Sequence, residues 1–97
     1  MMNNFMIVGR LLNKRENLDN HSIELEIAVK RAYKNIDGIY EEDILTCLLW
    51  DGIAKTTLDC CEINDIVGIK GKIQSKEGKM ELIAEKMTFL STRKEQE

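Results

Sequence analysis

The sequence predicts an all-β fold, a five-stranded barrel with one short helix between its third and fourth strands. Five segments have the residue types and the hydrophobic alternation of β-strands, and together they cover about half of the chain. One segment with helical spacing separates the third strand from the fourth. This order of elements is typical of the OB-fold, a small barrel of five strands.

The five predicted strands alternate between apolar and polar side chains. They span residues 4–12, 23–33, 44–50, 66–74 and 79–89. The second strand is the clearest, because its branched aliphatic side chains at positions 23, 25, 27 and 29 share one face of an extended chain. In the fourth strand the apolar residues at positions 67, 69 and 73 are expected to point inward, which leaves Lys70 and Lys72 on the outward face.

Turn signals predict which strands are neighbours. The pair Asp37-Gly38 predicts a chain reversal between the second and third strands. Residues 75–78 predict a short hairpin between the fourth and fifth strands, since Gly78 can adopt a positive φ. These two strand pairs are therefore expected to lie side by side.

A helix, a loop and a tail complete the chain. Asp51 can cap a helix over residues 52–61, whose apolar positions suit a plug at one end of the barrel. Residues 13–20 have no periodicity and are expected to form a loop. The sequence thus predicts one domain over residues 1–90 and a short polar C-terminal tail over residues 91–97.

The composition favours a soluble domain and excludes several functional classes. No apolar run approaches the roughly 18 residues of a membrane span, and no basic segment precedes the first apolar run, so we expect a cytoplasmic protein. The three cysteines, Cys47, Cys60 and Cys61, lack metal-ligand spacing and are expected to be small buried thiols. With one histidine, no paired catalytic motif and no Gly-rich phosphate loop, we expect no enzyme activity, metal or cofactor.

Four segments, in this order along the chain, carry a family resemblance. They are Asn-Phe-Met-Ile-Val-Gly-Arg-Leu at 4–11, Leu-Glu-Ile-Ala-Val-Lys-Arg-Ala-Tyr-Lys-Asn at 25–35, Asp-Ile-Leu-Thr-Cys-Leu-Leu-Trp at 43–50 and Val-Gly-Ile-Lys-Gly-Lys-Ile at 67–73. In this set and its spacing, which covers about residues 3–90, the chain resembles the bacterial single-stranded DNA-binding proteins of the SSB family.

The resemblance implies sequence-independent binding of single-stranded DNA in replication, recombination or repair. In such proteins the bases stack on aromatic side chains, which suits any sequence because every base has a π-face. Tyr33 and Trp50 match aromatic positions of the family, and Tyr40 can add to them. Ile44 stands where the family usually has another aromatic residue, and Phe5 is expected in the core or at a dimer contact.

Basic residues beside these aromatic residues are the expected phosphate contacts. They are Lys30, Arg31 and Lys34 in the second predicted strand and Lys70 and Lys72 in the fourth. The net charge of −3 opposes long-range attraction of a polyanion. Attraction must therefore be local, and residues 30–40 indeed hold three basic residues against one acidic residue.

The resemblance also implies partners and leaves alternatives open. In this family the first strands of two subunits pair, which predicts a homodimer through residues 3–11, or a homotetramer. RNA is an alternative ligand. The chain ends at Ser-Thr-Arg-Lys-Glu-Gln-Glu, without the acidic tail with which the family recruits replication proteins. Two other interpretations are an OB dimer like the primosomal replication protein, which residues 79–86 also resemble, and an OB-fold protein-interaction module that binds no nucleic acid.

Overall fold

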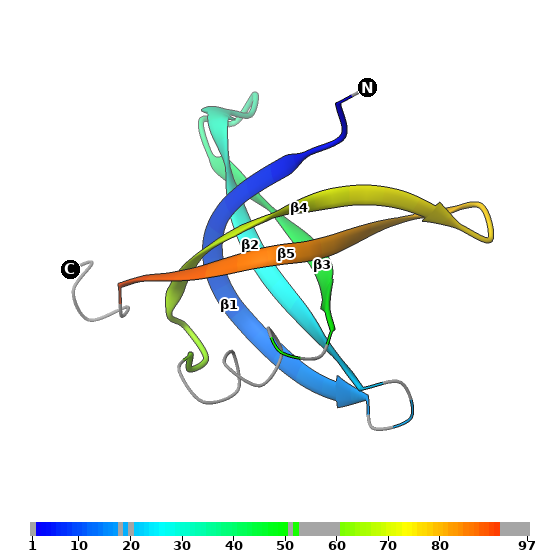
Figure 1. Cartoon of the computed structure of the whole chain (residues 1–97). Helices are drawn as coiled ribbons and strands as arrows, with labels where there is room; N and C mark the ends of the chain where they lie inside the picture. The colour runs from blue at the N-terminus through cyan, green and yellow to red at the C-terminus, as the bar shows by residue number, and fades with distance from the viewer. Residues whose placement is uncertain (1, 18, 20, 51, 53–60, 92–97) are drawn as a thin grey trace.

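Five strands form one closed barrel (Figure 1). The computed structural model describes residues 2–17, 19, 21–50, 52 and 61–91. The strands are β1 (Phe5–Asn17), β2 (Ser22–Lys34), β3 (Tyr40–Leu49), β4 (Ile66–Lys76) and β5 (Lys79–Ser91). Their hydrogen-bonded order is β1-β2-β3-β5-β4, which confirms the predicted five-stranded OB-fold barrel. The helix predicted over residues 52–61 falls mainly on residues 53–60, which lie outside the described part of the chain.

The barrel closes through one parallel and four antiparallel strand pairs. β1 pairs with β2 and with β4, β2 pairs with β3, and β4 pairs with β5, all antiparallel. The pairing of β3 with β5 is short and parallel, with Cys47 opposite Leu82 and Leu48 opposite Ile83. Both predicted hairpins are therefore confirmed, and Gly38 and Gly78 have the positive φ values, 78° and 79°, that their turns require.

Alternation along the strands fills the interior with aliphatic side chains. The fully buried residues include Leu11, Ile23, Leu25, Ile27, Leu49, Val67 and Ile69. Cys47 and Cys61 are buried in the same core, as predicted for them, while Cys60 lies outside the described residues. Burial raises the pKa of the Cys47 thiol to about 11, so this side chain acts as a small apolar group. Phe5 is partly buried and packs against the core.

β1 is longer than the sequence predicts. The loop expected over residues 13–20 is wrong for residues 13–17, because β1 continues to Asn17 and pairs there with Ser22 of β2. The pairing register shifts between Leu11 and Asn13, where one residue of β1 has no partner on β2. Residues 13–17 are Asn-Lys-Arg-Glu-Asn, which are all polar and show no alternation, so only their pairing with β2 reveals them as a strand.

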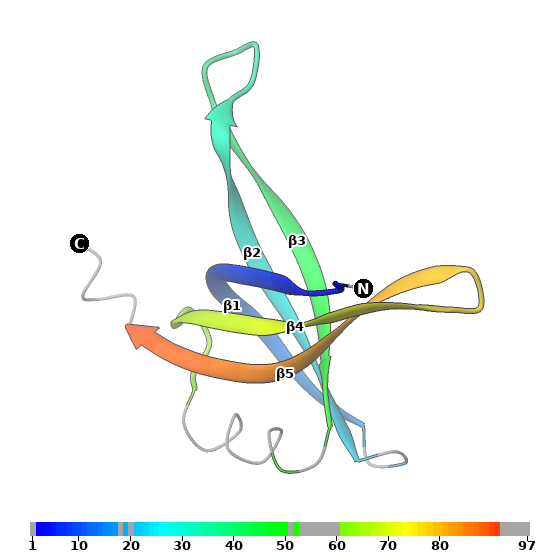
Figure 2. The same ribbon diagram turned by 45° about the horizontal axis from the view of Figure 1, so that its top comes forward.

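The hairpin of β2 and β3 projects from the barrel, and we call its outer part, residues 30–42, the hairpin arm (Figure 2). Tyr40 was expected in a loop before a strand beginning at Ile44, but β3 begins at Tyr40 itself. The error arises because Glu41, Glu42 and Asp43 are poor strand formers, and only their pairing with β2 places them in a strand. Among the described residues, no helix is long and apolar enough to cross a membrane.

Candidate nucleic-acid interface

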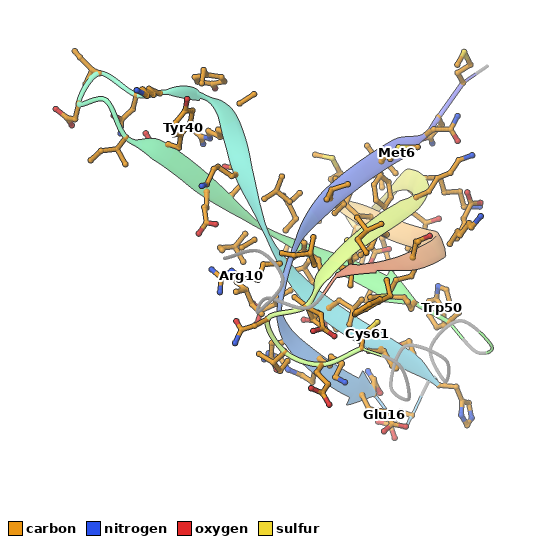
Figure 3. The ribbon with its side chains drawn as sticks, turned by 90° about the vertical axis from the view of Figure 1, so that its left-hand side faces the viewer. Met6, Arg10, Glu16, Tyr40, Trp50 and Cys61 are labelled. Carbon is orange, nitrogen blue, oxygen red and sulfur yellow. The ribbon has the colours of Figure 1, made fainter. Side chains whose placement is uncertain are left out.

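The outward face of β3 forms a continuous row that connects the hairpin arm to the barrel. Every second residue of β3 points outward, and we call this set the outer row. It consists of Tyr40, Glu42, Ile44, Thr46 and Leu48, and Trp50 continues it just beyond the strand. Figure 3 shows Tyr40 on the arm and Trp50 at the other end of the row. Two of the predicted aromatic residues thus stand on one track, with Ile44 between them at 53% exposure.

Trp50 lies in a trough between the outer row and the hairpin of β4 and β5. The trough consists of two adjoining hollows of about 640 and 610 Å³ that share Glu24, Leu48, Lys76 and Glu81. Trp50 and Arg15 line its first part together with the acidic residues Glu16 and Asp19, and its second part is lined by Lys79, Met80 and Glu77. Trp50 is 43% exposed, so part of this residue is accessible to a ligand. An open aromatic side chain beside a groove is what base stacking needs.

At the arm, two lysines and Tyr40 form a second cluster. The Nζ atoms of Lys30 and Lys34 lie 6.0 and 5.6 Å from the centroid of the Tyr40 ring. Lys34 pairs directly with Tyr40 across the hairpin, and Lys30 pairs with Glu42 two residues further on. All four side chains therefore share the outward face of the arm. The structure brings together these three predicted site residues.

Arg31 and Tyr33 lie differently. Arg31 points to the other face of the arm, where its Nε and Nη2 atoms donate to the Asp43 carboxylate over 3.2, 3.1 and 2.8 Å. This pairing raises the pKa of Arg31 and lowers that of Asp43, in each case mainly through the side-chain hydrogen bond. Tyr33 is 67% exposed and directly precedes Lys34, so alternation places it on the same face as Arg31 and away from Tyr40.

Lys70 and Lys72 lie on the outward face of β4, as predicted. Lys70 borders a shallow hollow of about 290 Å³ beside Met6 and Val8 of β1, which is distinct from the trough at Trp50. Lys72 follows two residues later, and its side chain is also exposed. The structure therefore does not bring these two lysines together with Tyr40.

Three pairs of lysines lie close together, one pair within β2 and two pairs across β4 and β5. Lys30 and Lys34 flank one ring, and the other two pairs face each other across β4 and β5: Lys70 with Lys86, and Lys76 with Lys79. None of the six forms an ion pair with a described residue. Like charges placed opposite each other destabilise a sheet, so the two pairs across β4 and β5 favour an anion between their members. Only the register of β4 and β5 reveals the pair of Lys70 and Lys86.

Solved structures of similar fold agree with this architecture. The small single-stranded DNA-binding protein of Streptomyces coelicolor superimposes with a TM-score of 0.66 at 15% identity, covering 93% of this chain and 95% of that one. The mitochondrial single-stranded DNA-binding protein of S. cerevisiae gives a TM-score of 0.73 at 14% identity, covering 95% and 99%. At such identities the similarity shows the fold alone.

Sequence relatives establish the family. No protein-family model matches the chain. Single-stranded DNA-binding protein B of Bacillus subtilis is 36% identical over 81 residues, which cover 78% of this chain and 71% of that protein. Single-stranded DNA-binding protein 1 of Streptococcus pyogenes is 28% identical over 93 residues, covering 88% and 71%. Together with the closed five-stranded barrel, these matches show that the chain belongs to the single-stranded DNA-binding protein family.

Proposed function

We propose that this chain binds single-stranded DNA without reading its sequence and thereby serves replication, recombination or repair. The observation that carries the proposal is the outer row of β3, which runs without interruption from the Lys30, Lys34 and Tyr40 cluster to Trp50 in the trough. Such a row offers stacking surfaces with cations at both ends, which is how proteins bind single strands of any sequence.

In this proposal bases stack on the aromatic rings, and the free ammonium groups form ionic contacts with phosphates. Tyr40 and Trp50 stack bases along the main track, and Tyr33 takes a base on the other face of the arm. Lys30 and Lys34 contact phosphates at the arm, and the lysine pair of the trough, Lys76 and Lys79, contacts them at the other end. RNA, which has the same phosphates and bases that stack in the same way, is the alternative ligand.

A second track runs over the outward face of β4. Lys70 and Lys72 point away from the barrel there, and Lys86 lies opposite Lys70. Because Lys70 borders a different hollow from Trp50, we assign these lysines to the part of a long strand that continues beyond the trough. A short oligonucleotide is not expected to reach both tracks.

Self-association is part of the proposal. Residues 5–10 of β1 pair with β4 on one edge, and β1 begins to pair with β2 only at Arg10. Among the described residues, the second edge of residues 5–9 therefore has no partner strand. Exposed edges of this kind favour pairing with another chain, so we propose a homodimer through β1, with a tetramer as a further assembly. Light scattering at micromolar concentration measures this, and a monomer there would contradict it.

We further propose that the protein acts in the cytoplasm by binding alone, without catalysis. The described fold supports this with a stacking surface and cations instead of an acid, a base and a nucleophile in one cleft. The bacterial relatives in the comparison are named for binding DNA.

The test uses Trp50, the only tryptophan in the chain. Adding oligo-dT should quench its fluorescence and saturate at a fixed number of nucleotides per subunit. Trp50→Ala should weaken binding by about 1 to 3 kcal/mol, the usual value of one stacked base, as measured by anisotropy of a labelled oligonucleotide. Trp50→Phe is the matched control, because it keeps a ring and should retain most of the affinity. Normal binding by Trp50→Ala would remove Trp50 from the interface.

A further inference from the structure

The hairpin arm contains an irregularity that the backbone alone does not stabilise. Lys30 pairs with Glu42 and Lys34 pairs with Tyr40, so three residues of β2 face a single residue, Glu41, of β3. The ladder is interrupted at this bulge, and bulges redirect the side chains that they carry. Tyr33 is one of the three bulged residues. Its direction therefore depends on whatever holds the bulge in place.

Arg31 spans this gap with its side chain. Its guanidinium forms a fork on Asp43, with Nη2 donating over 2.8 Å and Nε over 3.1 and 3.2 Å. Its third nitrogen, Nη1, lies 3.6 Å from Oε2 of Glu41. All three nitrogens of the guanidinium are thus engaged with carboxylates of the opposite strand, and forked pairing of this type fixes geometry as well as charge.

The network continues from Glu41 to the tip of the arm. The second oxygen of Glu41, Oε1, accepts a hydrogen bond from Asn35 Nδ2 over 3.1 Å. The side-chain oxygen of Asn35 in turn accepts from the backbone N–H groups of Asp37 and Ile39, over 2.9 and 3.0 Å. One chain of contacts therefore connects Asp43 near the barrel to the turn at the end of the arm. We call the set of Arg31, Asp43, Glu41 and Asn35 the brace.

The charges of the brace argue against a phosphate contact by Arg31. Two carboxylates surround one guanidinium, so the cluster is negative as a whole and does not attract a polyanion. A phosphate would have to displace Asp43 from a forked pair that already uses Nε and Nη2. By contrast, Lys30 and Lys34 on the other face of the arm have no described ion-pair partner.

We propose that Arg31 is a positioning residue, which holds the bulge of the arm through Asp43 and Glu41 and thereby fixes the direction in which Tyr33 meets a base. This inference rests on the proposed binding of single-stranded DNA. It differs from the expectation that Arg31 contacts phosphates, because a positioning role does not depend on the charge of Arg31 alone. It depends on the forked geometry and on the presence of Asp43.

Three variants separate the two roles. Arg31→Lys keeps the charge and loses the fork, Asp43→Asn removes an acidic charge, and Arg31→Lys with Asp43→Asn combines them. If the brace positions Tyr33, each single variant should weaken binding of oligo-dT by about fivefold or more, which corresponds to the smallest usual contribution of one stacked base. The double variant should bind no worse than the weaker of the two single variants. The salt dependence should not change in any of them.

Glu85→Gln is the matched control for Asp43→Asn, since it removes one exposed carboxylate from β5, away from the arm. It should tighten binding slightly through net charge. If Asp43→Asn tightens binding more than this control does, then Asp43 merely competes with DNA for Arg31, and the positioning role is overturned. The positioning role is also overturned if Arg31→Ala lowers the slope of log K against log salt by about 0.7, which is the effect of one lost phosphate contact.

A measurement without DNA tests the brace separately. Amide hydrogen exchange across residues 30–42 should become faster in Arg31→Lys and Asp43→Asn but not in Glu85→Gln. Tyr33→Ala should weaken binding in the wild-type background and have little further effect with Asp43→Asn. If hydrogen exchange is unchanged in these two variants while the wild-type protein binds DNA, the brace is refuted and the proposed function is not. Wild-type protein that does not bind oligo-dT refutes the proposed function, and with it the role of Tyr33.

Discussion

The lysine pair of the trough gives the sharpest test of where a single strand lies. We consider replacing both Lys76 and Lys79, which pair across the end of the hairpin and line the trough beside the outer row. Each phosphate contact contributes about 0.7 to the slope of log K against log salt for single strands. Four free ammonium groups on the main track, two at the arm and two in the trough, therefore predict a slope of about −2.8.

Removing the trough pair should lower this slope to about −1.4, because two of the four contacts are lost. The assay is fluorescence anisotropy of a labelled oligo-dT at several salt concentrations. Its length should be about 8 nucleotides, within the 4 to 16 that one OB-fold covers, so that only one track is occupied. Thermal unfolding is the companion measurement. Since like charges face each other in this pair, the double alanine variant should melt no lower than the wild type.

The matched comparison is the other lysine pair of the same hairpin. Replacing Lys70 and Lys86 by Ala removes the same charge from β4 and β5 but from the face that borders a different hollow. The slope measured with the short oligonucleotide should stay near −2.8, and only a longer oligonucleotide, which also reaches the second track, should show a loss. If this pair changes the short-oligonucleotide slope as much as the trough pair does, the assignment of the main track to the trough is wrong.

Three further predictions concern stability and affinity. Gly71→Ala should lower the free energy of unfolding by about 1 to 3 kcal/mol or more in a denaturant titration, because its Cβ would lie 1.9 Å from the carbonyl oxygen of Ile83. Gly68→Ala is the control: its Cβ meets nothing closer than 3.7 Å, so the free energy of unfolding should change little. Ile44→Trp should tighten binding of oligo-dT by up to about 1 to 3 kcal/mol, since it adds a ring to the middle of the outer row, and unchanged affinity would mean that bases do not pass there. The pKa of Asp43 is lowered from 3.8, so the ionised carboxylate stabilises the fold above that pH, and this contribution is lost as the pH falls below it. The difference in unfolding free energy between wild type and Asp43→Asn should therefore shrink below pH 3.8. A difference that stays constant with pH would contradict the ion pair.

The sequence by itself determined the barrel and most of its core. Alternation in β2 and β4 is local information, because successive side chains of a strand point to opposite faces whatever the partner is. It identified Ile27 and Ile69 as interior residues and Lys70 and Lys72 as outward ones. The turns at Gly38 and Gly78 were equally local, since only their own φ values decide them.

Register, in contrast, was decided only in the tertiary structure. A register shift of one residue moves every later side chain to the other face, and such a shift occurs between Leu11 and Asn13. In the arm, two additional residues of β2 interrupt the pairing with β3. The second half of β1 is entirely polar, so only its pairing with β2 reveals it as a strand. In the arm, alternation beside the pairs Lys34–Tyr40 and Lys30–Glu42 places Tyr33 on the opposite face from Tyr40 and brings Arg31 to Asp43, whereas the sequence alone grouped Arg31 with the phosphate-binding lysines.

The candidate site shows the same division. Trp50 and Tyr40 could be selected from the sequence because an aromatic side chain is a stacking surface wherever it is exposed. The pair of Lys70 and Lys86 could not be selected, because these residues are 16 residues apart and only the bulged ladder of β4 and β5 places them opposite each other. Residue type is a property of the chain, but a groove, a facing pair of charges and a braced bulge depend on which strands meet and in which register.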